Sequence, residues 1–237
     1  MEWTEQVFRY CERGTNPEFW GEPLNALSNL AFIAGALAAL LIARKQPSGA
    51  IDRYHYILIG LVLLIGIGSG LFHTFATRWS GVADALPIAV FIFVYLGFAL
   101  GRLLGFGLKG VFTGIGIFIL LNSLPGLIRC EGGPCLNGTT GYFPALFAML
   151  FLGGIARYLG KPSSTSLLVA GCVFAVSAAF RTFDFTLCEY TEVAGQELGT
   201  HFIWHLLNAL TLFLLLRTAV LYGHSKKNQP VTRRELE

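Results

Sequence analysis

The sequence predicts an all-α integral membrane protein built as a bundle of seven transmembrane helices. Hydrophobic residues make up 54% of the 237 residues and charged residues only 13%, whereas soluble domains carry about 25% charged residues. Seven apolar runs also approach the roughly 20 residues with which a helix crosses a bilayer. These runs are residues 25–43, 55–75, 82–101, 108–128, 143–159, 166–187 and 200–222. The first run follows acidic and aromatic residues instead of a basic stretch, so we expect a transmembrane helix there and not a signal peptide.

The basic residues predict the orientation of these spans. Seven spans place the two termini on opposite sides of the membrane, and twelve of the seventeen Lys and Arg residues fall on the side of the C-terminus. Because cytoplasmic loops carry an excess of Lys and Arg, we expect a cytoplasmic C-terminus and an N-terminus outside, in a periplasm or lumen. The formal net charge of +3 then reflects topology and does not indicate nucleic-acid binding. The chain divides into an N-terminal outer segment (1–24), a seven-transmembrane domain (25–222) and a cytoplasmic basic tail (223–237).

The outer segment carries two carboxylates, Glu12 and Glu22, among aromatic side chains. Carboxylates at this level are typical of a solvated cap above a membrane interface. Glu22 also precedes a proline, as an acid does at the positive end of a helix dipole. Asn25, Ser28 and Asn29 then follow on one helix face and form a polar stripe that helix packing alone does not require.

Polar residues also flank the junction of the second and third runs. Ser69 and His73 are four residues apart in GIGSGLFHT and share a helix face. The third run opens with ADALP, where Asp84 is compatible with an ordinary helix-capping carboxylate and Ser69 with a small packing residue. Since the second run travels outward and the third begins outside, all three side chains are expected in the outer leaflet.

The seventh run begins with GTHFIWH, which places His201 and His205 four residues apart on one helix face. Alone, this spacing is equally compatible with two unrelated interfacial histidines and with two ligands of a metal site whose third ligand lies elsewhere. The topology places His73 at the same outer level, whereas His55 and His224 fall at cytoplasmic ends. Three histidines with an open fourth position are the arrangement of catalytic zinc, so we expect Zn²⁺ at this level.

Four cysteines are also expected outside, where disulfides form. Cys11 lies in the first segment, Cys130 and Cys135 lie between the fourth and fifth runs, and Cys188 follows the sixth run. Four cysteines allow two disulfides in three pairings, and spacing does not choose among them.

Taken together, five segments resemble the alkaline ceramidase family, whose seven-helix fold is shared with the adiponectin receptors. The segments are YCER…FWGEPLNALSN, GIGSGLFH, ADALP, FRTFDFTLC and GTHFIWH. The resemblance extends from residue 10 to residue 222, and the order of the motifs makes it specific. It implies that zinc is held by His73, His201 and His205, with Ser69 and Asp84 beside the metal. It also implies a disulfide between Cys11 and Cys188, which leaves Cys130 and Cys135 as a second pair.

The chain departs from this family in the outer segment. Family members bind calcium through acidic and polar groups there, and Glu12 and Glu22 match two of those acids. Arg9, however, stands where the family has another acidic residue, and Gly14 stands where it has a side-chain ligand. The resemblance therefore leaves Ca²⁺ binding open.

The function that the resemblance implies is zinc-dependent hydrolysis of the amide bond of ceramide, or of a related lipid amide, to a fatty acid and a sphingoid base. Asp84 would take the proton of the attacking water and return it to the amine, and the Ser69 hydroxyl would stabilise the oxyanion. The apolar bundle would hold the acyl chain. Asp184 and Asn208 are the candidate acceptors that orient the metal-binding histidines. The partner is thus a membrane lipid, with neither nucleic acid nor an obligatory protein partner expected.

An alternative is a non-catalytic lipid receptor or binding protein of the same fold, in which zinc only braces the helices. A structural zinc is closed by four protein ligands, so the two functions differ in whether Asp84 ligates the metal directly. A transporter is a weaker alternative, because no half-to-half repeat or pair of broken helices is evident.

Overall fold

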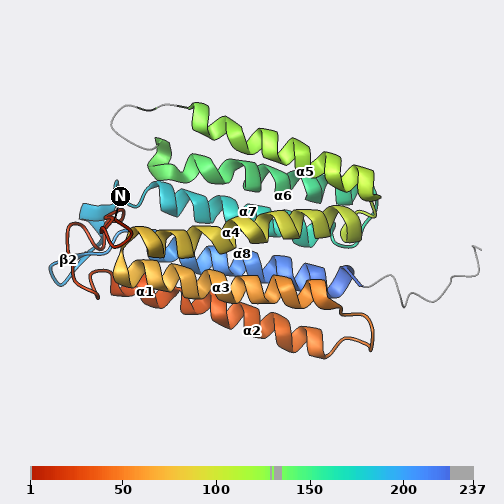
Figure 1. The fold of residues 1–237 in the computed structure, drawn as a ribbon, viewed down its shortest axis with the longest axis horizontal. Coiled ribbons are helices and arrows are strands. Elements are labelled where there is room, and N and C mark those ends of the chain that lie inside the picture. Colours follow the sequence, from red (N-terminus) through yellow and green to blue (C-terminus); the bar gives the residue numbers. More distant parts are fainter. Residues whose placement is uncertain (1, 129, 131–134, 225–237) are drawn as a thin grey trace, which may run out of the picture.

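In the computed structural model the chain forms a bundle with seven helices long and apolar enough to cross a membrane (Figure 1). The structure describes residues 2–128, 130 and 135–224. The predicted fold class is confirmed within this part of the chain. The tail expected at 223–237 lies, beyond its first two residues, outside the described residues.

Several of the seven spans consist of more than one helical element. The helices are α1 (Pro23–Ser28), α2 (Leu30–Arg44), α3 (Arg53–Phe75), α4 (Arg78–Phe98), the π-helix η1 (Ala99–Leu103), α5 (Leu108–Ser123), η2 (Leu124–Leu127), η3 (Cys135–Tyr142), α6 (Phe143–Tyr158), α7 (Ser164–Thr182), η4 (Cys188–Thr191) and α8 (His201–Tyr222). A short antiparallel hairpin, β1 (Glu192–Val193) with β2 (Gln196–Glu197), precedes α8. The spans are Pro23–Arg44, Arg53–Phe75, Arg78–Leu103, Leu108–Leu127, Cys135–Tyr158, Ser164–Thr182 and His201–Tyr222.

The last helix occupies the interior of the bundle. In α8, 61% of an apolar 18-residue stretch is buried, which is the largest share of any span. In the span that contains α5, only 6% of the corresponding stretch is buried. The helix packs against α2, α3 and α7, and α5 lies at the edge of the bundle (Figure 1). Polar side chains at the start of α8 are therefore surrounded by protein on several sides.

One end of the bundle is covered by residues 2–22 and by the β1–β2 hairpin, and we call it the capped end (Figure 1). Two disulfides lie in its connecting segments. Cys11 is bonded to Cys188, and Cys130 is bonded to Cys135. Both pairs agree with those that the resemblance implies. The first disulfide fixes the N-terminal segment to the chain that follows α7.

The opposite end is closed by a separate polar cluster. The Asp52 carboxylate accepts a hydrogen bond from Arg102 (2.6 Å) and contacts the His55 ring (3.0 Å). Arg102 also donates to the backbone carbonyl of His224 (3.1 Å), beyond the end of α8. His55 therefore has a structural role, far along α3 from His73.

The sixth span ends earlier than its apolar run predicts. The run was expected to continue to residue 187, but α7 ends at Thr182. Asp184 follows, is completely buried, and accepts hydrogen bonds from three backbone N–H groups, including those of Thr200 (2.8 Å) and His201 (2.9 Å). The chain turns because these bonds satisfy the carboxylate, whereas hydropathy registers only the apolar residues on either side.

The approach of α3 to α4 depends on Gly68. A Cβ atom at this position would collide with the backbone carbonyl of Ala83 and would lie 3.2 Å from the backbone nitrogen of Asp84. By contrast, a Cβ at Gly60, in the same helix, would meet nothing within 4 Å. The contact between the helices therefore requires glycine at 68 and not at 60.

We expect Gly68→Ala to lower the free energy of unfolding by about 1–3 kcal/mol, the usual cost of overpacking. Gly60→Ala is the matched control, and it should leave stability unchanged or slightly higher because alanine favours helix. Thermal unfolding of the two purified proteins in the same detergent measures the difference. Equal unfolding temperatures would contradict the close approach.

Candidate metal centre

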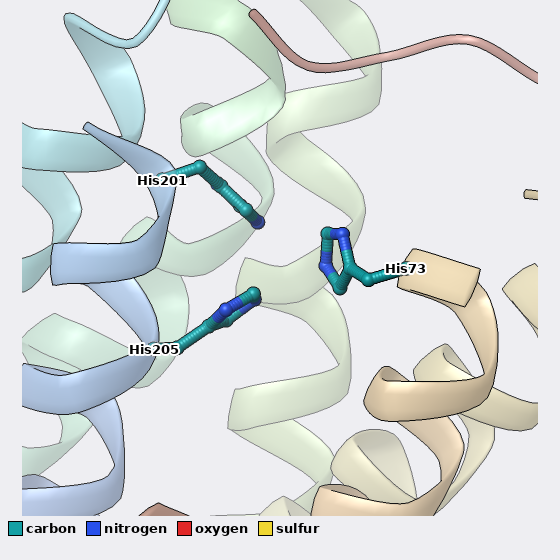
Figure 2. Close-up of side chains that lie close together, drawn as sticks. All are labelled: His73, His201 and His205. Carbon is teal, nitrogen blue, oxygen red and sulfur yellow. The ribbon is translucent and has the colours of Figure 1, made fainter. Parts of the chain in front are cut away.

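Three histidines meet at the capped end of the bundle. His73 lies near the end of α3, His201 is the first residue of α8, and His205 lies one turn further on. Each offers a ring nitrogen, and these nitrogens all lie within 4.8 Å of one another. Figure 2 shows the rings converging from the two helices. All three residues are at most 2% exposed.

The start of α8 is fixed by the carboxylate of Asp184 and by Gly199. The two Asp184 hydrogen bonds to Thr200 and His201 cap the helix, because its first N–H groups have no partner within the helix. Gly199 precedes them with φ +64°, and a Cβ there would meet the side chains of Asp184 and Cys11. The four-residue spacing then places His201 and His205 on one face.

Glu22 orients the ring of His73. Its Oε2 lies 2.8 Å from Nδ1 of His73, and since a carboxylate only accepts, Nδ1–H is the donor. Although burial raises the pKa of Glu22, its contacts with His73, Arg13 and Asn25 outweigh this effect and lower it below the ordinary value. Nε2 of His73 is buried and has no hydrogen-bond partner among the described residues. The lone pair on this nitrogen is free for a metal.

Ser28 has the same role for His205. Its Oγ lies 2.8 Å from Nδ1 of His205 and also donates to the carbonyl of Asn25 (2.9 Å). A hydroxyl has one proton, so Ser28 accepts from His205 and leaves Nε2 without a proton. The ring of His201 is instead held by stacking on Tyr10, with ring centroids 3.8 Å apart.

These observations fit a metal ion. Imidazole nitrogens are common ligands of zinc and other transition metals, and buried nitrogens without hydrogen bonds are costly unless something binds them. Acceptors on the remote nitrogens are also typical of metal-binding histidines. The three-histidine group could therefore hold a metal ion.

Ser69 and Asp84 border the same small pocket as His201 and His205. Ser69 is buried one turn before His73 on α3, and its hydroxyl faces the Asp84 carboxylate from α4. The structure thus brings together the five side chains that the sequence placed at one level. Asn208, one turn after His205 on α8, also lines this pocket.

An apolar pocket continues from this point into the bundle. The two pockets share four lining residues, Ile65, Ile88, Tyr142 and Asn208. Beyond them the walls are almost entirely aliphatic and aromatic side chains from α3 to α8. The polar pocket therefore joins a volume suited to a hydrocarbon chain.

Arg181, in the last turn of α7, also lines the polar pocket. Its guanidinium carbon lies 5.3–5.7 Å from the ring centroids of Tyr10, Tyr142 and Trp204. It also donates a hydrogen bond to the Tyr10 hydroxyl (3.3 Å). A charged residue within a membrane span marks a functional site by default, and this signal was available from the sequence.

The expected orienting residues are placed differently. Asp184 supports the backbone of His201 and not an imidazole ring, and the ring acceptors are Glu22 and Ser28. The second acid of the outer segment, Glu12, is buried and accepts from the backbone N–H groups at the start of α1. Burial raises the pKa of Glu12 above its ordinary value.

The fold and the site together define the class of protein. It is an integral membrane protein with a candidate metal centre between two of its helices, α3 and α8. The Ceramidase family model matches residues 8–236, nearly the whole chain. The chain belongs to the Ceramidase family. Neither a curated protein nor a solved structure was found to match it. Family membership implies a hydrolase that acts on lipid amides and supports ceramide hydrolysis in general.

We expect Ser28→Ala to weaken metal binding about 10–100-fold, the usual effect of removing the acceptor behind a metal-binding histidine. Ser123→Ala is the matched control, because Ser123 donates to the carbonyl three residues before it, as Ser28 does, but is exposed on α5. Metal retained against a competing chelator measures the effect. Equal retention in the two variants would contradict the role of Ser28.

Proposed function

We propose that the protein is a zinc-dependent hydrolase that cleaves the amide bond of ceramide, or of a related lipid amide, to a fatty acid and a sphingoid base. The observation that carries this proposal is the group of three buried histidines, of which His73 and His201 each have a ring nitrogen without a hydrogen-bond partner among the described residues. Ser69 and Asp84 border the same pocket as His201 and His205. Membership of the Ceramidase family supplies the class of substrate.

In this proposal His73, His201 and His205 hold the zinc. Zinc, when bound there, acts as a Lewis acid and lowers the pKa of water. Asp84 accepts the proton of the attacking water and later delivers it to the departing amine, because one carboxylate can act as base and then as acid. Ser69 donates a hydrogen bond to the oxygen on which negative charge develops.

The apolar pocket receives the acyl chain of the substrate. In this proposal the first carbons of the chain lie next to Asp84, and the lining residues that the two pockets share, among them Ile65, Ile88 and Tyr142, support this position. The scissile amide then lies where the polar side chains converge, and the bundle excludes bulk water from the chain.

The geometry favours hydrolysis over the alternative of a non-catalytic, zinc-braced receptor. A structural zinc takes four protein ligands. The group of ligand atoms found within 4.8 Å of one another at this place in the described residues consists of the three histidines and does not include Asp84. This arrangement supports an open fourth position with Asp84 beside it.

We further propose that the N-terminal segment (1–24) and the capped end face the outside, that residues 25–222 form the hydrolase domain, and that the tail from 223 is cytoplasmic. The excess of Lys and Arg on the C-terminal side supports this orientation. A reporter that is active only in the cytoplasm, fused after the last residue, should be active. Activity of the same reporter at the N-terminus alone would reverse the orientation.

We expect the purified protein to hydrolyse ceramide and to lose this activity with a zinc chelator. His205→Ala should lose both bound zinc and turnover, since two histidines leave an incomplete site. His224→Ala, at the opposite end of the bundle, is the control and should keep both. Elemental analysis and release of fatty acid from a panel of ceramides and phospholipids measure the outcome. Ceramide hydrolysis by a zinc-free protein would contradict the proposal.

Asp84→Asn should separate catalysis from binding. The amide cannot accept a proton, so we expect turnover to fall about 10²–10⁴-fold, the usual contribution of a general base, while zinc content stays unchanged. Full turnover in this variant would return Asp84 to a helix-capping role. Loss of zinc would make Asp84 a ligand and favour the receptor.

A further inference from the structure

Arg13 is a buried arginine (3% exposed) beneath the N-terminal segment. Its Nε donates to Oε1 of Glu22 at 2.6 Å. Its Nη1 donates to the backbone carbonyls of Asn16 (3.2 Å) and Glu18 (2.8 Å). The guanidinium is therefore hydrogen-bonded at three points to the loop between residues 13 and 22.

The remaining nitrogen reaches a different part of the bundle. Nη2 of Arg13 donates to the carbonyls of His73 (2.9 Å) and Thr74 (3.1 Å), in the last turn of α3. A guanidinium has five N–H donors, and these two contacts bring the number of its hydrogen bonds to five. Arg13 thus joins the N-terminal segment to the helix that carries His73.

The oxygen atoms around Arg13 are of the kinds that bind calcium ions in proteins. Calcium prefers six to eight carboxylate and carbonyl oxygens, often supplied by several segments. Here one carboxylate and four carbonyl oxygens converge on a positive charge that belongs to the chain. Gly21 leaves room for it, since a Cβ there would lie 2.8 Å from Nη1 of Arg13.

The acids expected to bind calcium are already engaged. Glu12 accepts from the backbone N–H groups of Leu24 (2.7 Å) and Asn25 (2.8 Å) through its two oxygens. Glu22 accepts from Arg13 through one oxygen, and from Asn25 and His73 through the other. Arg9 and Gly14 of the same segment offer no side-chain oxygen, so the residues present do not fit a calcium ion.

We propose that Arg13 is a built-in cation that replaces a divalent ion, so that the N-terminal segment closes over the metal centre without calcium. Arg13 acts on the centre through Glu22, which it holds by a 2.6 Å ion pair and which in turn orients Nδ1 of His73. It is a positioning residue for His73. Because arginine stays charged at every physiological pH, the cation at this place does not depend on the calcium concentration.

The test compares the purified full-length wild type with Arg13→Ala and Arg78→Ala. Arg78 is the matched control, because it also pairs with an acid of the N-terminal segment, Glu5, but its side chain is 40% exposed. Unfolding temperature, and zinc retained against a chelator that binds zinc but not Ca²⁺, are measured in calcium-free buffer, in millimolar Ca²⁺, in millimolar guanidinium chloride and in millimolar tetramethylammonium chloride.

The wild type and Arg78→Ala should have the same unfolding temperature and zinc content with Ca²⁺ or in calcium-free buffer. Arg13→Ala should retain zinc about 10-fold or more weakly in calcium-free buffer, as expected when the support of a metal-binding histidine is lost. Ca²⁺ or guanidinium should restore much of this loss by entering the vacated oxygen cage, whereas tetramethylammonium should not. A merely structural role for Arg13 would not produce this selective rescue.

Two outcomes would overturn the proposal. One is an unfolding temperature of the wild type that is higher with Ca²⁺ than in calcium-free buffer. The other is zinc retention by Arg13→Ala equal to that of Arg78→Ala. If Arg13→Ala does not fold, the wild-type measurement still decides, together with Arg13→Lys, which keeps a charge but cannot bridge five oxygens. None of these readouts uses ceramide turnover, so they remain informative if the proposed hydrolysis is wrong.

Discussion

The buried carboxylate of Glu22 is the constraint on which the capped end depends. It is 1% exposed, and a buried charge is tolerated only when it is paired and hydrogen-bonded. Three partners meet this need, and each comes from a different place: Arg13 from the N-terminal segment, Asn25 from α1 and His73 from α3. Moving any one of them would remove a hydrogen bond from the buried carboxylate of Glu22. The loop, the first span and a candidate metal ligand are therefore held in one arrangement.

The histidine group shows why the last span lies inside the bundle. α8 supplies two of the three histidines and also packs against α2, α3 and α7. A peripheral helix such as α5 would expose those rings to lipid on one side. From the interior position, polar side chains at the start of α8 face Ser69 and Asp84, while the helix further along borders the apolar pocket. One helix thus forms part of the walls of both the polar and the apolar pocket.

Much of this arrangement follows from sequence periodicity and topology. Hydropathy predicts the seven spans, and the direction of each span brings His73 to the level of His201 and His205. The end of α7 was missed because the apolar residues around Asp184 continue the hydropathy signal, while the three N–H donors that turn the carboxylate inward lie elsewhere in the chain. The acceptors behind the histidines were missed for the same reason. Glu22 and Ser28 are 51 and 177 residues away in sequence from the histidines they contact. Helical spacing relates only residues a few positions apart, so it does not predict such contacts.

The disulfide between Cys11 and Cys188 has a consequence for the order of biosynthesis. Its two cysteines are 177 residues apart, so the N-terminal segment cannot be fastened until the chain beyond α7 has been made. His201 and His205 follow later still, on α8. A chain that stops before Cys188 has neither the complete histidine group nor the covalent closure over it, and one that stops before His201 has a single histidine of the group. The group is therefore complete only once α8 has been made, after the segment that covers it can already be fastened.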